Sequence, residues 1–333
     1  MNNMLFLGCF FIYACAMITL GWYVSRKKKS GDDFLLGGRS LPLFLTLGSA
    51  VGTMVGTGSS VGAVGFGYSN GWAGMLYGVG GAAGILLLAW LFSPVRKFRF
   101  MTMSEEICYY TGGSKLIKNL VAILIFISSI GWLGAHILGG GLYLSWASGL
   151  DIKTAKIIIA CAFIVYVGIG GYSAVVWIDT IQSVILFFGF IVMALLAVHH
   201  VGGWGNIQHA VAPAAQSLFA VDKLGIIRQR IYSAKTVSSV RRSFIITGLL
   251  YLMFSFLPAI IGMAVWTMNT HLSNSGFAFL YATQLLPPFL SMAILLAGMS
   301  ANMSSGSSDA IAAVSIMLRD LYTLVTGHMP KQN

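Results

Sequence analysis

Eight apolar runs of about twenty residues constrain this chain more than any other feature of its sequence. A helix of about twenty residues crosses the roughly 30 Å hydrocarbon core of a bilayer. With 57% hydrophobic and 9% charged residues, the chain lacks the polar surface of a soluble protein. We therefore predict an all-α, polytopic membrane protein with about eight transmembrane segments. The runs are Leu5–Ser25, Leu41–Gly67, Gly74–Val95, Leu120–Trp146, Ala155–Gly170, Ala174–Val198, Phe244–Met268 and Leu286–Val325.

Basic residues indicate how the chain is oriented in the membrane. Lys and Arg are enriched in cytoplasmic loops, and here they concentrate between Arg26 and Arg39, Arg96 and Lys118, and Arg228 and Arg242. With these segments inside, the amino terminus is outside. The first run is then a membrane helix and no signal peptide, because its basic cluster follows it. We assign the net charge of +11 to these loops, not to nucleic-acid binding.

The same charge pattern predicts that one span is missing. The loop from His199 to Lys223 is placed outside, yet the segment after Arg228 is as basic as the inside loops. The apolar pieces between them are too short to cross a bilayer. We favour a deletion or a splice; a re-entrant element over Gln208–Lys223 is the alternative.

A glycine-rich stretch interrupts the second apolar run. Gly48, Gly52 and Gly56 recur every fourth residue, so in a helix they share one face that a partner backbone can approach closely. Because glycine weakens a helix interior by about 1 kcal/mol relative to alanine, we predict that the helix opens between Gly52 and Gly58 and offers carbonyls to a cation. A continuous glycine-lined packing helix is the alternative.

The last apolar run carries a serine-rich stretch from Ala301 to Asp309. The hydroxyls of Ser304 and Ser305 and the Ala301 carbonyl lie on the same side of a helix and can supply oxygen ligands to a small hard cation. All three groups are neutral, so the set suits a monovalent ion. In the alternative interpretation the hydroxyls only bond back to carbonyls of the preceding turn.

Two titratable residues lie deep inside apolar runs. A carboxylate is costly in a membrane, so we predict that Asp309 contacts a coupling ion or a substrate amine. His136 follows Trp132 by one helical turn in a glycine-rich run, and the pair is a candidate lining of the substrate cavity. A core histidine with satisfied hydrogen bonds is the alternative for His136.

Four segments, in order along the chain, resemble signature segments of the sodium/solute symporter family. The first is similar to its D-x-x-x-G-G-R-S-L entry, and the second to its G-G-x-x-A-V-x-x-T-D-x-x-Q segment, with Ile178 in place of the usual threonine. The third is similar to Q-R-x-x-A-A-K, and the fourth to the sodium-site helix with its D-x-Y end. The segments are Asp32–Leu41, Gly170–Gln182, Gln229–Lys235 and Ala301–Tyr322.

The resemblance implies a leucine-transporter-like fold, in which two inverted five-helix repeats follow one extra amino-terminal helix. Within a single membrane domain, 1–333, it places the extra helix at 5–25, the first repeat at 41–198 and an incomplete second repeat at 228–326. The first helix of the second repeat and the carboxyl-terminal helices are expected to be absent. This agrees with the charge count, and the chain is then a truncated or spliced form.

The resemblance also implies a sodium site. Its ligands are the carbonyls of Gly52, Val55 and Ala301 and the hydroxyls of Ser304 and Ser305. Many relatives place an acidic or amide residue where this chain has Met54. Asp179 matches a family aspartate near the cytoplasmic mouth that assists sodium release; the alternative is an interfacial carboxylate exposed to water.

The function implied is sodium-coupled symport of a small organic solute across the plasma membrane, the inner membrane in a bacterium, by alternating access. The cofactor is Na+, and the partners are the solute and the lipid bilayer. A membrane sensor or regulatory subunit, or a non-transporting truncated form, is the alternative. An intramembrane enzyme would need a nucleophile and base or a metal-ligand set, for which only Asp309 and His136 are candidates, so we predict no enzymatic activity.

Overall fold

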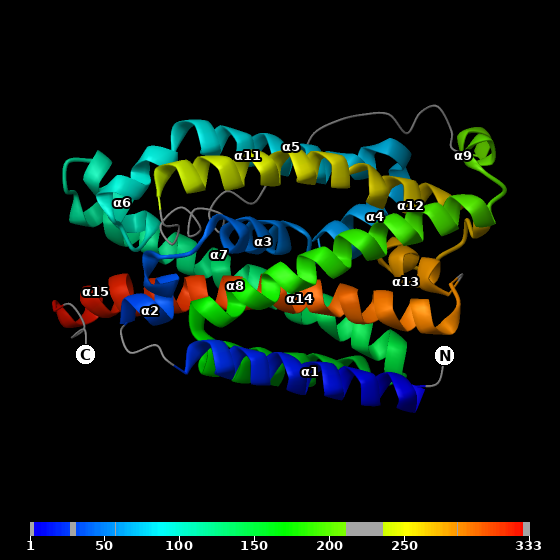
Figure 1. The fold of residues 1–333 in the computed structure, drawn as a ribbon, viewed down its shortest axis with the longest axis horizontal. Helices are drawn as coiled ribbons and strands as arrows, with labels where there is room; N and C mark the ends of the chain where they lie inside the picture. The colour runs from blue at the N-terminus through cyan, green and yellow to red at the C-terminus, as the bar shows by residue number, and fades with distance from the viewer. Residues whose placement is uncertain (1–2, 27–30, 57, 211–235, 285, 329–333) are drawn as a thin grey trace.

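Helices make up nearly all of the described chain in this computed structural model, which describes residues 3–26, 31–56, 58–210, 236–284 and 286–328. The long helices run side by side along one axis (Figure 1). The helices of the amino-terminal half, short ones included, are α1 (Asn3–Ser25), α2 (Gly31–Leu36), η1 (Gly37–Arg39), α3 (Leu43–Met54), η2 (Gly58–Gly62), α4 (Ala63–Asn70), η3 (Gly71–Met75), α5 (Leu76–Leu91), η4 (Ser93–Phe98), α6 (Met103–Tyr110) and α7 (Lys115–Ser148).

The carboxyl-terminal half continues the bundle. Its helices are α8 (Ile152–His200), α9 (Trp204–Ala210), α11 (Val237–Phe254), α12 (Phe256–Met268), η5 (Ser275–Phe277), α13 (Ala278–Thr283), α14 (Pro288–Ile316), η6 (Met317–Leu321) and α15 (Tyr322–Thr326). Local signals explain several boundaries. Ser114 caps α7, Asp151 caps α8, Thr236 caps α11, and Pro288 stands in the first turn of α14.

The predicted opening of the second run is confirmed. Helix α3 ends at Met54, Val55 leaves the helical region with φ −97° and ψ 73°, and η2 begins at Gly58. Its glycines do allow close approach, because a Cβ at Gly48 would lie 2.3 Å from the Thr180 hydroxyl oxygen. The stretch therefore serves both for helix packing and for helix opening.

Helix α8 consists of two arms that meet at Gly171. The backbone there has φ 55° and ψ −168°, a conformation essentially restricted to glycine, and a Cβ would lie 2.7 Å from the Phe34 ring. In Figure 1 the first arm runs along α1 and the second returns through the bundle beside α14. The turn keeps the fifth and sixth predicted runs separate, as the sequence indicated.

Five of the eight predicted runs correspond to helical stretches with the length and composition of membrane spans. Among the described residues, five helical stretches are long and apolar enough to cross a membrane by length and composition: Asn3–Ser25, Ala63–Leu91, Lys115–Ser148, Gly171–His200 and Val237–Met268. The remaining runs correspond to α3, which the opening shortens, to the first arm of α8, and to the serine-rich α14.

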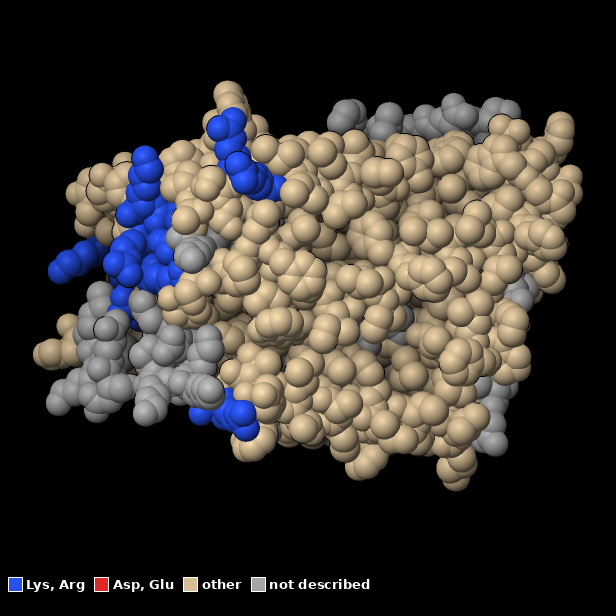
Figure 2. Space-filling view, in the orientation of Figure 1, with Lys and Arg blue, Asp and Glu red and all other residues tan. Residues whose placement is uncertain are grey.

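Lys and Arg gather at one end of the bundle. Arg26, Arg96, Lys118, Arg241 and Arg319 lie where α1, η4, α7, α11 and η6 begin or end, and Figure 2 shows blue side chains mostly toward this end. Helix α9 and the start of α11 lie at opposite ends (Figure 1). The proposed missing span and the segment Gln229–Lys235 fall outside the described residues.

Candidate functional site

The broken end of α3 meets α14 and the second arm of α8 in the middle of the bundle. A Cβ at Gly52 would lie 2.9 Å from the Asp179 carbonyl oxygen and 3.2 Å from the Ser304 hydroxyl oxygen. A Cβ at Gly56 would lie 2.4 Å from the Ser305 hydroxyl oxygen. The glycine face therefore brings backbone oxygens of α3 next to serines of α14.

Ser305 joins the two predicted halves of the ion site directly. Its hydroxyl donates to the carbonyls of Gly52, at 3.3 Å, and Thr53, at 3.1 Å, across the two helices. Val55 is fully buried just after α3 ends, in non-helical backbone that takes its carbonyl out of the helical ladder. Ala301 lies in α14 one turn before Ser305. The five predicted ligands thus belong to two segments, the end of α3 and α14, that lie against each other.

Asp179 lies where α3 and α14 meet. The carboxylate is fully buried and accepts hydrogen bonds from the hydroxyls of Ser49, at 2.8 Å, Ser308, at 3.4 Å, and Ser304. The alternative of a water-exposed interfacial carboxylate is therefore wrong. The physical reason is that Gly48 and Gly52 let α8 come so close to α3 that no water reaches the side chain.

Sequence reasoning missed two residues of this cluster. Ser49 precedes Gly52 by three residues, and Ser308 follows Ser304 by four, so helical spacing alone places each on the same face as a predicted ligand. Thr53 links them, because its hydroxyl donates to the Ser49 carbonyl at 2.9 Å and lies 3.5 Å from the Ser308 hydroxyl. The hydroxyls that donate to Asp179 are themselves neutral, and they stabilise its carboxylate by hydrogen bonding.

A second buried polar cluster joins α7 to α14. His136 lies with Nδ1 3.1 Å from Asn302 Oδ1 and Nε2 3.1 Å from Asp309 Oδ2, and Asn302 Nδ2 donates to the His136 carbonyl at 2.6 Å. All three residues are at most 2% exposed. Trp132 is half-buried beside His136, with ring centroids 6.4 Å apart. The predicted cavity candidates therefore lie together, and Asn302 was missed although it is an amide inside an apolar run.

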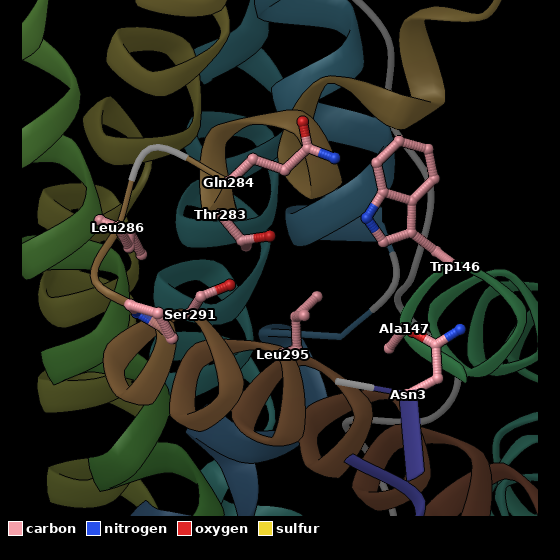
Figure 3. A pocket seen from close by; sticks show the side chains of 9 residues that line it. Asn3, Trp146, Ala147, Thr283, Gln284, Leu286, Ser291 and Leu295 are labelled. Carbon is pink, nitrogen blue, oxygen red and sulfur yellow. The ribbon is translucent and has the colours of Figure 1, made fainter. Parts of the chain in front are cut away.

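A separate pocket of about 550 Å³ opens at the end of the bundle away from the basic residues. Figure 3 shows the Trp146 indole nitrogen and the Thr283 and Ser291 hydroxyls directed into it. Its lining is neutral and belongs to the ends of α1, α7, α13 and α14. None of Trp132, His136 and Asp309 lines this pocket.

The opposite, basic end is held together by ion pairs. Lys118 Nζ lies 3.1 Å from Asp320 Oδ1, and Ser104 donates to Asp320 Oδ2 at 2.6 Å. Arg319 pairs with Glu105 at 3.5 Å. Glu105 thus takes part in an ion pair, and its neighbour Glu106 is fully buried.

The D-x-x-x-G-G-R-S-L segment turns the chain at this same end. Gly37 and Gly38 have φ near 65°, which explains the paired glycines. Arg39 follows with φ 54° and donates to the Phe100 carbonyl at 3.1 Å, and Arg96 donates to the Arg39 carbonyl at 3.3 Å. Burial, together with the nearby charges of Arg39 and Arg99, lowers the pKa of Arg96. The segment ties the start of α3 to the loop after α5.

The family model "Sodium:solute symporter family" matches residues 34–222, more than half of the chain. The chain belongs to the sodium:solute symporter family. It is a multi-pass membrane protein, as its apolar helices indicate. The match covers the broken helix α3, its glycines and Asp179, whereas α14 lies outside the matched range.

Curated proteins resemble this chain over different lengths. Solute carrier family 5 member 4A of Mus musculus is 28% identical over 235 residues, 70% of this chain and 36% of that protein. The osmoregulated proline transporter OpuE of Bacillus subtilis (strain 168) is 25% identical over 346 residues, 93% of this chain and 70% of that protein. The chain thus spans about a third of the length of the mouse relative.

A solved structure shares the fold. A Na+-coupled sialic acid symporter, in a substrate-bound outward-open state, superposes with a TM-score of 0.79 and 20% sequence identity. The alignment covers 98% of this chain and 75% of that one. The predicted all-α symporter fold is confirmed by this match.

Proposed function

We propose that this chain binds sodium between α3 and α14 and couples it to the movement of a small organic solute by alternating access. The observation that carries the proposal is the Ser305 hydroxyl, which contacts the last carbonyls of α3 where that helix opens. Family membership supports sodium as the coupling ion. Two relatives are named as a sodium/glucose cotransporter and a sodium/proline symporter. These names support a small organic molecule as the solute but do not identify the solute of this chain.

The proposed ligands are the carbonyls of Gly52, Val55 and Ala301 and the hydroxyls of Ser304 and Ser305. Carbonyl and hydroxyl oxygens replace the hydration shell of a small hard cation, and the neutral set suits one positive charge. An ion there bridges two helices that otherwise meet through serine hydrogen bonds, and so holds the two helices in one arrangement.

Asp179 is proposed to assist ion release. The Ser304 hydroxyl that donates to Asp179 is also a proposed sodium ligand, so the ion and the carboxylate share one side chain. The carboxylate attracts the ion over a short distance in a poorly screening interior. A cation leaving the ligand set therefore has a charged acceptor beside it.

The domain organisation and membrane placement are part of the same proposal. One membrane domain, 1–333, contains the extra helix 5–25, a first repeat 41–198 and an incomplete second repeat 228–326. The amino terminus is outside, in the plasma membrane or a bacterial inner membrane, because the basic end of the bundle is the side expected in the cytoplasm. Trp132, His136 and Asp309 are proposed to face the solute path.

Sodium-dependent thermal stability tests the ion site. A ligand that binds only the folded state stabilises it by RT ln(1 + [Na]/Kd), so the unfolding temperature of the purified chain should rise with sodium and not with potassium. Removing both hydroxyls, Ser304→Ala with Ser305→Ala, should abolish the rise. Ser243→Ala is the matched control, since within the described residues this buried hydroxyl donates back to the Val240 carbonyl of its own helix, α11, and to no other group.

Two other outcomes separate the classes of function. A sodium response that survives in the double variant contradicts the proposed ligands. Sodium binding without sodium-driven uptake of any solute into vesicles would favour the membrane sensor or non-transporting form over a symporter.

Gly56→Ala gives a sharper test of the contact between the end of α3 and Ser305 of α14. The added Cβ would lie 2.4 Å from the Ser305 hydroxyl oxygen, so the hydroxyl has to move away from the α3 carbonyls. We expect sodium affinity, measured by the same thermal shift, to fall at least about tenfold, the effect of about 1.4 kcal/mol in lost coordination. Gly134→Ala is the control, because a Cβ there has open space around it. Equal affinities in the two variants would contradict this geometry.

A further inference from the structure

The protonation of His136 follows from the hydrogen bonds of Asn302. The Asn302 amide nitrogen is fixed by donating to the His136 carbonyl at 2.6 Å, so the amide oxygen faces His136 Nδ1 at 3.1 Å. An amide oxygen only accepts hydrogen bonds. Nδ1 therefore carries a hydrogen, and in the neutral ring Nε2 is left with a bare lone pair.

That lone pair faces a carboxyl group. Nε2 lies 3.1 Å from Asp309 Oδ2, and within the described residues neither Asp309 oxygen accepts a hydrogen bond from another group. A bare nitrogen and a carboxylate oxygen repel each other at this distance. One additional proton removes the repulsion. If the proton is on Nε2, the pair is an imidazolium and a carboxylate; if it is on Oδ2, the pair is a neutral imidazole and a carboxylic acid. Both forms contain the same atoms and have no net charge.

We infer that His136 and Asp309 form a proton-binding site between α7 and α14. Loss of the shared proton leaves one net negative charge in a site whose two residues are at most 2% exposed, which is costly in a membrane interior. The bound proton is thus the charge-balancing ion of this pair. Asn302 acts as a positioning residue, because it fixes which ring nitrogen faces Asp309.

The charged and titratable groups on the neighbouring elements are few. From α8, Asp179 faces α14 through Ser308, and Lys156 packs against α7 at Gly141. The described part of α3 has no titratable acid or base, and Lys118 of α7 lies at the basic end of the bundle, paired with Asp320. No basic side chain is recorded in contact with Asp309 in the described residues, so His136 and the proton are its charge partners there.

The proton site lies close to the proposed sodium site, and this step rests on the proposed function. Asp309 follows Ser305 by one turn of α14, about 6 Å along the axis. A Cβ added at Gly56 would lie 3.3 Å from His136 Cε1 and 2.4 Å from the Ser305 hydroxyl oxygen. Two positive charges this close in a protein interior repel enough to weaken each other's binding on the order of tenfold or more. Sodium and this proton therefore compete.

Calorimetric titration of sodium into the purified chain, in two buffers of different ionisation enthalpy over a series of pH values, counts the protons released. We expect release that rises to about one proton per sodium ion and a sodium affinity that strengthens on the order of tenfold from low to high pH. Asp309→Asn, and as a second variant His136→Gln, should bind sodium without proton release. Asp151→Asn is the control, an exposed helix cap where asparagine serves equally well.

Sodium binding with no proton release in the wild type, or with release unchanged in Asp309→Asn, would overturn the competition while leaving the proposed sodium site intact. Nitrogen NMR of histidine-labelled chain tests the proton site without sodium, with His136→Gln assigning the signal. We expect hydrogen on His136 Nδ1 at every pH and a second ring proton or acid hydrogen bond at Nε2 that disappears in Asp309→Asn. Hydrogen on Nε2 with bare Nδ1 would overturn the site itself.

Discussion

Asp179→Asn is expected to weaken sodium binding on the order of tenfold or more while leaving the sodium-free chain as stable as the wild type or more stable. The carboxylate is fully buried and accepts hydrogen bonds from the hydroxyls of Ser49 and Ser304, so its charge has lost its hydration, which costs stability in the folded state. Asparagine keeps an oxygen acceptor for Ser304 and removes the charge. The substitution then weakens sodium binding, because the ion loses the attraction of the carboxylate, but it does not weaken the sodium-free fold.

The measurement is the unfolding temperature with and without sodium, for wild type, Asp179→Asn and the exposed Asp151→Asn. Opposite changes in stability and in sodium affinity distinguish an electrostatic role from a structural one. If Asp179→Asn lowered the sodium-free stability by as much as it lowered the sodium response, Asp179 would be a packing residue, and its proposed part in ion release would be wrong.

Gly262→Ala is expected to destabilise the fold by about 3 kcal/mol, at the upper end of ordinary overpacking. A Cβ at this position of α12 would lie 2.4 Å from the Val64 carbonyl oxygen, 2.5 Å from the Tyr68 nitrogen and 2.7 Å from the Gly67 carbonyl carbon. All three atoms are backbone of α4, so no side-chain rotation relieves the clash. The two helices would have to move apart.

Thermal unfolding in detergent checks this prediction against Gly131→Ala on α7, where a Cβ meets nothing within 4 Å. That control should unfold at the wild-type temperature or slightly above it, because alanine favours a helix over glycine. Equal unfolding temperatures for the two variants would mean that α4 and α12 do not pack as closely as described. Loss of folded protein only in Gly262→Ala would support the close packing.

Sequence spacing pointed to most of the residues of the proposed ion-binding face. Gly52 and Gly56 on one helix and Ser304 and Ser305 on another were identified because four-residue spacing and glycine weakness are local properties of a helix. The basic segments likewise indicated which ends of the helices lie together. The opening after Met54 occurs within the predicted stretch.

The tertiary structure decided which polar groups share a site. Asp179 is separated from Ser49 by 130 residues and from Ser304 by 125, and His136 from Asn302 by 166. Helical periodicity states which face a residue occupies but not which helix covers that face. That choice depends on how closely backbones approach, and so Asp179 could be taken for a water-exposed carboxylate.

The sequence by itself therefore determined an all-α membrane bundle, a helix that opens at its glycines, and the hydroxyls facing that opening. Only the tertiary structure decided that Asp179 is buried against those hydroxyls and that Asn302, His136 and Asp309 form one cluster. The physical reason is that apolarity, propensity and spacing act along one helix, whereas burial and charge pairing depend on contacts between helices distant in the chain.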